Sequence, residues 1–175
     1  RVAKVKVGEG TLDGVGVGPL VNEAAVVKVA NQVDDARAKG AEVPVGGKRL
    51  REDGLDRGHF YAPTVVTGVT EDMLIYREET FGPVAPIITY DDVDQVIAMA
   101  NDTNYGLAAY VYTRDLSTAI RAMEGLRFGI IGINDVNPTS AGAPFGGMGD
   151  SGLGREGGHE GIGEYQETKL AGIAL

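Results

Sequence analysis

Two adjacent glutamates and a nearby phenylalanine have the residue types and spacing of a nucleoside-binding element. Glu78 and Glu79 precede Phe81, and a bend at Gly82-Pro83 follows. A carboxylate accepts hydrogen bonds from ribose hydroxyls, and an aromatic ring packs against a heterocycle. The ordinary alternative is a solvated acidic pair beside a core aromatic. We favour the nucleoside interpretation because acid, ring and bend occur together.

Two glycine-rich segments are similar in sequence to nucleotide-binding loops but lack features that such loops require. Gly152 to Gly157 matches the dinucleotide fingerprint, but a loop rather than a strand precedes it. The acidic residue expected about 20 positions later would lie beyond Leu175. Gly14 to Gly18 lacks the lysine of a phosphate loop and is expected to form a turn. Neither segment is predicted to bind pyrophosphate.

Three residues in the last third of the chain have open interpretations at this point. Phe145 lies between a proline and two glycines, and is either a plug of the core or a wall of a ligand pocket. For Arg155 and Glu167 the ordinary outcome is a solvated surface charge. Spacing alone does not decide between these alternatives.

Composition excludes several classes of partner. The net charge of −9 and the pI near 4.7 would repel nucleic acid and anionic lipid surfaces. No apolar run approaches the ~20 residues that span a bilayer, and a cytoplasmic location is expected. With no cysteine and two isolated histidines, His59 and His159, no metal site is expected. The chain begins at Arg1 and resembles the middle of a longer polypeptide, so an upstream portion is expected.

Hydrophobic periodicity predicts an α/β fold. A helix is predicted over residues 22–39, capped by Asn22 and ended by Gly40 in the left-handed conformation. Its core face is predicted to consist of Val26, Val29, Val33 and Ala36. A strand is predicted over 61–69, in which Pro63 indicates an edge position or a late start.

A regular alternation of strands and helices follows. Strands are predicted at 84–90, 108–112 and 128–133, with intervening helices that Asp92 and Asp115 can cap. This order predicts a parallel, right-handed unit of three strands covered by helices.

The remainder of the chain is predicted to be a long loop and a lone strand. The loop over 134–154 leaves the carboxyl end of a buried strand, where α/β sheets bind ligands, so a functional loop is favoured over a disordered one. The strand over 170–175 must pair with an edge of this chain or with another chain.

Ordered motifs along essentially the whole chain resemble the aldehyde dehydrogenases. The segments that carry the resemblance are Gly18-Pro19-Leu20-Val21-Asn22, Glu78 to Pro83, Tyr105 to Ala108, Gly132 to Asn134, Pro144 to Glu156 and Glu164 to Lys169. Two segments, 70–86 and 151–157, are most similar to succinate semialdehyde dehydrogenases. The chain is thus identified as similar to the C-terminal, catalytic-domain portion of such an enzyme. The resemblance implies a three-layer αβα fold with a largely parallel sheet over residues 1–165, and an oligomerisation strand over 166–175.

The resemblance also implies roles for individual residues. In the family, the second glutamate of the acidic pair holds the nicotinamide ribose and the phenylalanine packs beside the nicotinamide. These roles map onto Glu79 and Phe81, with NAD or NADP as coenzyme. Phe145 would line the aldehyde tunnel, and Ser140, with Thr139 beside it, would hold a substrate carboxylate. Arg155 and Glu167, as a partly buried pair, would tie the loop to the last strand near a subunit contact.

The family mechanism requires groups that this chain does not contain. A cysteine thiolate attacks the aldehyde, hydride passes to the nicotinamide, and a glutamate activates water. Cysteine, base and pyrophosphate site are expected upstream of Arg1, so no catalytic residue is assigned here and the 175 residues alone are predicted to be inactive. The segment Met148-Gly149-Asp150 replaces a usual lysine-bearing one, so any contact of that lysine is not carried over.

The expected parent enzyme is a homodimer or homotetramer that oxidises a small semialdehyde, with succinate semialdehyde favoured. The alternative is a non-catalytic module that oligomerises or binds nucleotide with a relic of the same fold.

Overall fold

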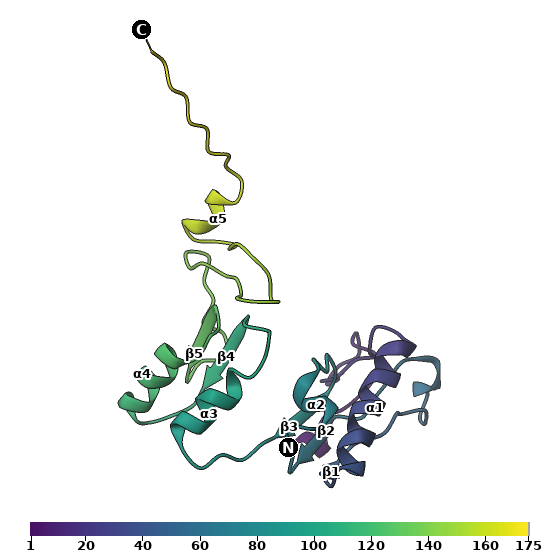
Figure 1. The fold of residues 1–175 in the computed structure, drawn as a ribbon. Helices are drawn as coiled ribbons and strands as arrows, with labels where there is room; N and C mark the ends of the chain where they lie inside the picture. The colour runs from purple at the N-terminus through teal and green to yellow at the C-terminus, as the bar shows by residue number, and fades with distance from the viewer. Residues whose placement is uncertain (175) are drawn as a thin grey trace. The chain divides into compact units, whose positions relative to one another are not determined.

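The computed structural model describes residues 1–174, which form two compact units, with the boundary in the chain between Thr89 and Tyr90 (Figure 1). The expected boundary at residue 165 stays a prediction. Within residues 1–174, no helix combines the length and the apolar character needed to cross a membrane.

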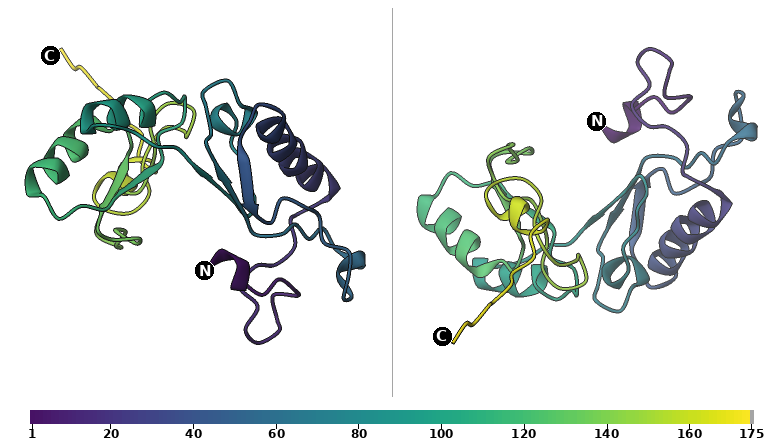
Figure 2. Two further views of the ribbon diagram at one scale, coloured as in Figure 1. Left: turned by 90° about the horizontal axis from the view of Figure 1, so that it is seen from below. Right: turned by 90° about the horizontal axis from the view of Figure 1, so that it is seen from above.

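The first unit is a small mixed sheet covered by a long helix. Its elements are the 3-10 turns η1 (Val2–Lys4) and η2 (Leu55–Arg57), the helices α1 (Glu23–Ala38) and α2 (Leu74–Arg77), and the strands β1 (Glu42–Val45), β2 (Thr64–Thr67) and β3 (Val84–Ile87). The strand order is β1-β2-β3, with β1 antiparallel and β3 parallel to β2. Figure 2 shows α1 lying along one side of these strands. The late strand start that Pro63 predicted is confirmed.

Local signals in the sequence fix the ends of α1. The Asn22 side chain accepts a hydrogen bond of 2.9 Å from the backbone nitrogen of Ala25, which satisfies one free donor of the first turn. Gly40 follows the helix with φ of 95°, a conformation that glycine adopts without steric cost. The predicted helix, its cap and its stop are therefore confirmed.

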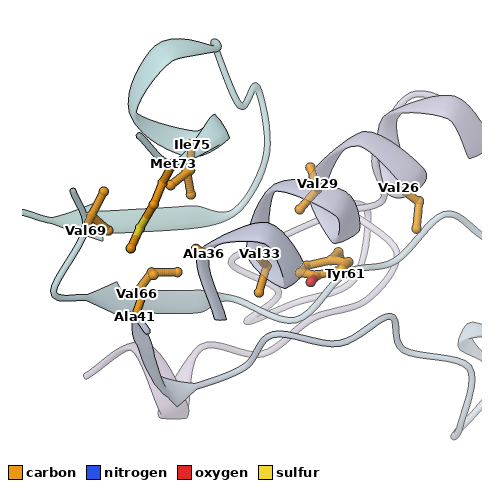
Figure 3. Close-up of a cluster of buried hydrophobic side chains, with 10 residues drawn as sticks. All are labelled: Val26, Val29, Val33, Ala36, Ala41, Tyr61, Val66, Val69, Met73 and Ile75. Atoms are coloured by element: carbon orange, nitrogen blue, oxygen red, sulfur yellow. The ribbon is translucent and has the colours of Figure 1, made fainter. Parts of the chain in front are cut away.

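The buried face of α1 forms the core of this unit (Figure 3). Val26, Val29, Val33 and Ala36 are buried as predicted. They pack with residues from the rest of the unit, including Tyr61, Val66, Met73 and Ile75. Burial of each large apolar side chain stabilises the fold by about 1.5–3 kcal/mol, so α1 and the sheet depend on one another.

The second unit begins with two capped helices around a parallel strand pair. Its elements are α3 (Val93–Ala100), β4 (Ala108–Val111), α4 (Leu116–Gly125), β5 (Ile130–Ile133) and α5 (Glu160–Gly163). The side chain of Asp92 accepts from the backbone nitrogen of Gln95 at 2.9 Å, and that of Asp115 accepts from Thr118 at 2.7 Å. Both predicted caps are confirmed. Strands β4 and β5, which precede and follow α4 in the sequence, pair in parallel, and the right-handed crossover between them stays a prediction.

Two expectations about strand pairing are not met in residues 1–174. The strand β3 pairs with β2, in the register Thr64 with Val84, and it does not join β4 and β5 in one three-stranded sheet. Periodicity marks where strands lie, but pairing is a contact between distant segments that periodicity does not encode.

The expected strand at the end of the chain is also not formed. Residues 170–174 make no strand, and Leu170 and Ile173 are 96% and 85% exposed. A strand is stable only when a neighbour completes its hydrogen bonds, and no edge of the described chain does so. The last residue of the expected strand, Leu175, lies outside the described residues.

Candidate functional site

The two glutamates at the end of α2 have different surroundings. Glu78 ends this helix in an extended conformation, with φ of −104° and ψ of 140°. Its Oε2 atom accepts a hydrogen bond of 3.1 Å from Nε2 of Gln32 on α1. Side chains of successive residues in extended backbone point to opposite sides. Glu78 and Glu79 are both exposed, but Glu78 is bound to α1 through Gln32, and we expect Glu79 to point away from it.

Phe81 combines an unusual backbone with an exposed ring. Its φ is 46°, in the left-handed region that non-glycine residues rarely adopt, and the residue is 83% exposed. An exposed aromatic residue with a strained backbone is a signal of function, because neither property stabilises the fold. Phe81 is thus held outside the core two residues after Glu79.

A second close contact fixes the far side of this element. A Cβ atom on Gly82 would lie 2.6 Å from Cγ2 of Val29, so the backbone here packs directly on α1. The next residue, Pro83, accepts a hydrogen bond of 2.8 Å from the nitrogen of Thr64 at the start of β2. The segment Glu79-Thr80-Phe81 therefore projects between two points of attachment to the first unit.

A hollow of about 470 Å³ lies between α1 and α2, beside this element. Its lining residues are Glu23, Ala24, Val27, Lys28, Asn31, Gln32, Leu74 and Glu78. Carboxylates, amides and one ammonium group provide both acceptors and donors for a hydroxyl-bearing ligand.

In the second unit, the long loop after β5 begins with a polar tie. Asn134 has φ of 55°. Its side chain accepts from the nitrogen of Thr113 at 3.0 Å and donates to the carbonyl of Thr113 at 2.8 Å. The start of the loop is thereby fixed to the segment that follows β4. Further on, Phe145 and Glu156 form an antiparallel bridge with two hydrogen bonds of 2.7 Å.

The Arg155 guanidinium holds the loop together from within. Its Nη1 atom donates to the carbonyl oxygens of Gly147 at 2.9 Å and Gly154 at 2.7 Å. Glu167 is exposed, and within residues 1–174 it makes no ion pair with Arg155. The physical reason is local: nearby loop carbonyls already bind the guanidinium. The role of the Arg155 and Glu167 pair at a subunit contact stays a prediction.

Phe145 and Arg155 line the same hollow, which has a volume of about 680 Å³. The other lining residues include Leu153, Glu156, Glu164 and Tyr165. Phe145 is 40% exposed, so its ring is available to a ligand as well as to the protein. Arg155 therefore lies beside the predicted aldehyde wall rather than at a distance from it.

Ser140 is placed apart from that hollow. It is exposed, and its carbonyl oxygen accepts from the nitrogen of Ala143 at 3.1 Å. Its neighbour Thr139 lines a smaller hollow of about 180 Å³ together with Pro144 and Phe145. Of the two predicted carboxylate-binding residues, Thr139 is therefore the one that shares a hollow with Phe145.

The sequence analysis missed two residues that shape these sites. Gln32 binds Glu78, and Ser151 Oγ accepts a hydrogen bond of 3.0 Å from the nitrogen of Gly106, which ties the loop to the start of β4. An amide three residues after Val29 on an otherwise apolar helix face was a usable signal for Gln32. No local pattern marks Ser151.

The chain matches the sequence profile of the aldehyde dehydrogenase family over residues 1–171. It belongs to this family. The predicted resemblance to the aldehyde dehydrogenases is thus confirmed at the level of the family. The chain is 48% identical to the mitochondrial succinate-semialdehyde dehydrogenase of Oryza sativa subsp. japonica, over 96% of this chain and 31% of that protein.

Two further aldehyde dehydrogenases extend the comparison. A succinate-semialdehyde dehydrogenase of Escherichia coli K12, named for NADP(+), is 48% identical over 99% of this chain and 35% of its own length. The crystal structure of a betaine aldehyde dehydrogenase from Staphylococcus aureus, in complex with NAD+, superposes with a TM-score of 0.88 at 41% identity. The superposition covers 94% of this chain and 33% of the betaine aldehyde dehydrogenase chain. The chain therefore spans about a third of the length of these relatives.

Proposed function

We propose that the chain is the C-terminal portion of an NAD(P)-dependent aldehyde dehydrogenase that oxidises a small semialdehyde, succinate semialdehyde being favoured, to the acid. The observation that carries this proposal is the projecting segment Glu79-Thr80-Phe81, held at Glu78 and at Gly82 in a chain of this family. A solvated acidic pair would need neither attachment.

In this proposal the first unit binds the coenzyme. The Glu79 carboxylate accepts hydrogen bonds from the nicotinamide ribose, and the Phe81 ring packs beside the nicotinamide. Both residues are exposed in the described chain, and so both are free to contact a ligand. NAD and NADP both remain in the proposal, since one relative is named for NADP(+) and another is a complex with NAD+.

The second unit supplies part of the aldehyde pocket. Phe145 is proposed as an apolar wall, and Ser140 with Thr139 as hydroxyl donors to the carboxylate of a semialdehyde. Support comes from Thr139 and Phe145 lining one hollow, and from the names of the succinate-semialdehyde relatives.

The covalent chemistry of this proposal needs a thiol from outside these 175 residues, because the chain contains no cysteine. The coenzyme, when bound, accepts the hydride. The residues of this chain bind and orient the coenzyme and the aldehyde around that transfer.

The experiment that tests the proposal uses the full-length polypeptide that carries these residues. Its reading frame should encode a cysteine upstream of Arg1, and the purified protein should reduce NAD or NADP with succinate semialdehyde. Betaine aldehyde, which carries a cation instead of a carboxylate, is the matched control substrate and should react more slowly. A cysteine-bearing segment only downstream of residue 175 would refute the C-terminal placement.

Binding of coenzyme without reduction, in a full-length protein that lacks a thiol, would instead favour the non-catalytic module. The absence of cysteine from the chain is the observation that supports this second candidate function. The cytoplasmic location stays a prediction, which fractionation of cells tests.

The fold of the parent enzyme and its assembly complete the proposal. We expect the parent enzyme to contain a three-layer αβα domain with a largely parallel sheet. The exposed apolar residues Leu170 and Ile173 support a role of the last segment as an added strand in a homodimer or homotetramer. Light scattering of the full-length enzyme, with and without the residues after Thr168, tests this role. An unchanged particle mass would refute it.

A further inference from the structure

Gln32 is a buried polar residue on the apolar face of α1. It is 1% exposed, although its neighbours on that face are valines and alanines. Its Nε2 atom donates to Oε2 of Glu78, and its Oε1 atom is buried without a hydrogen-bond partner among the described residues. A buried amide that is only half satisfied calls for a physical reason.

Stability alone does not supply that reason. A hydrogen bond to a charged acceptor contributes about as much as an unsatisfied buried acceptor costs, so the two contributions of the Gln32 amide nearly cancel. Methionine has a similar shape and no polar atoms to satisfy. An apolar residue here would pack at least as well, and the remaining effect of the amide is to fix the position of Glu78.

The segment that contains Glu78 needs such a fixed point. Helix α2 has four residues, a length at which a helix in water does not hold itself together. Asp35 of α1 and Lys39, the residue that follows α1, hold the first end of α2: Asp35 Oδ2 accepts from the nitrogen of Leu74 at 2.8 Å, and Lys39 Nζ donates to the carbonyl of Asp72.

Gln32, Asp35 and Lys39 are spaced by three and four residues, and so they lie along one side of α1. The contacts of Asp35 and Lys39 hold the entry to α2. The Gln32 contact lies at its exit, immediately before Glu79. The direction in which Glu79 and Phe81 leave the helix therefore depends in part on this amide, together with the packing of Gly82.

We propose that Gln32 is a positioning residue for coenzyme binding: through Glu78 it orients Glu79 and Phe81, which touch the coenzyme. This inference rests on the proposed function and extends it to a residue on a neighbouring helix. Gln32 itself contacts Glu78, and its effect on the coenzyme is indirect.

The test is made in the full-length polypeptide with Gln32→Met, measuring NADH and NADPH binding by fluorescence. The dissociation constant of the coenzyme should rise about tenfold, as for loss of a hydrogen bond to a charged group. The KM of the aldehyde and the melting temperature should stay unchanged. Gln95→Met, the same change on α3 of the other unit, is the matched control and should bind coenzyme normally.

A second pair of variants changes Glu78, the exposed partner in this contact, and leaves the buried residues of the core unchanged. Glu78→Ala should weaken coenzyme binding as Gln32→Met does. Glu78→Gln keeps an oxygen that can accept from Nε2 of Gln32, and should retain most of the affinity.

The outcomes separate this inference from the proposed function. Normal coenzyme affinity in Gln32→Met and Glu78→Ala, together with weakened binding in Glu79→Gln, would overturn the positioning role alone. Normal affinity in all three variants would overturn the coenzyme site itself. A lower melting temperature with unchanged coenzyme affinity would show a purely structural role for Gln32 and would also overturn the inference.

Discussion

The two candidate sites are held in place by different means. In the first unit, a short segment around Glu79 and Phe81 is attached through a side-chain contact at Gln32 and a backbone contact at Gly82, both to one helix. In the second unit, a long loop is held by hydrogen bonds from Arg155 to its carbonyl groups and by the backbone bridge between Phe145 and Glu156.

This difference predicts how each site responds to change. The first site depends on the core packing of α1, so substitutions in this helix should act on coenzyme binding. The second depends on contacts internal to the loop, so substitutions there should act on the aldehyde. The predictions below, in order of decreasing effect, test that separation.

The largest effect should be seen when the 175 residues are studied without the rest of the enzyme, which is proposed to supply the catalytic thiol. The 175-residue chain alone should have no dehydrogenase activity with any aldehyde, because a covalent thiohemiacetal requires a thiol and the chain has none. The measurement is coenzyme reduction by the purified chain against a heat-killed sample. Reduction above that background would contradict this prediction, because the 175 residues would then contain a complete catalytic site.

The next largest effect should follow from Glu79→Gln in the full-length enzyme. Loss of a well-placed charged acceptor for the ribose is worth roughly 1.5 to 3 kcal/mol, or about ten- to a hundredfold in hydride transfer. Single-turnover kinetics with saturating aldehyde measure this step. The matched change Glu71→Gln, on the exposed turn before α2, should leave it unchanged. Equal rates for wild type and Glu79→Gln would mean that the acidic pair is merely solvated.

The parts of this molecule that were predictable from sequence are those set by neighbours in the chain. Asn22, Asp92 and Asp115 cap helices through hydrogen bonds to residues three positions away. Gly40 ends α1 because its own backbone conformation requires glycine. Such signals are complete within a few residues, and each prediction based on them is confirmed.

The parts that were not predictable depend on distant contacts. Gln32 and Glu78 are 46 residues apart, and only the fold brings them together. The pairing of β3 with β2, in the register Thr64 with Val84, is likewise a contact between segments that are distant in the sequence. Arg155 binds loop carbonyls, whereas the family pattern associates it with Glu167, because side-chain partners depend on loop conformation.

A smaller effect is expected from Arg155→Ala, compared with Glu167→Ala, in the full-length enzyme. The arginine change removes two hydrogen bonds to the carbonyls of Gly147 and Gly154, which should destabilise the protein by about 1.5–3 kcal/mol and raise the KM of the aldehyde. Within residues 1–174 no such contact of Glu167 is seen, and we expect this residue to matter only for assembly. Denaturant titration, aldehyde kinetics and light scattering distinguish these effects. Equal losses in all three measurements would indicate that the two residues act as a pair after all.

The smallest expected effect compares one carboxylate in each unit. The backbone amide of Leu74, and then the Lys39 ammonium, lower the pKa of Asp35 below its usual value of 3.8. The hydroxyl and the backbone amide of Thr118 lower the pKa of Asp115 in the same direction. A folded-state pKa below the unfolded value contributes stability that is present above the unfolded pKa and is lost as the pH falls through the folded pKa.

Both carboxylates should therefore stabilise their helices at neutral pH and lose that contribution below pH 3.8. The amide proton shifts of Leu74 and Thr118, followed by NMR during acid titration, report the two midpoints separately. Both midpoints should lie under 3.8. Asp35→Asn should abolish the titration at Leu74 and leave that at Thr118 intact, because the two residues belong to different units. A midpoint at or above the usual value in either unit would show that its carboxylate has no stabilising contact. A shift of the Thr118 midpoint in Asp35→Asn would show that the two units are coupled.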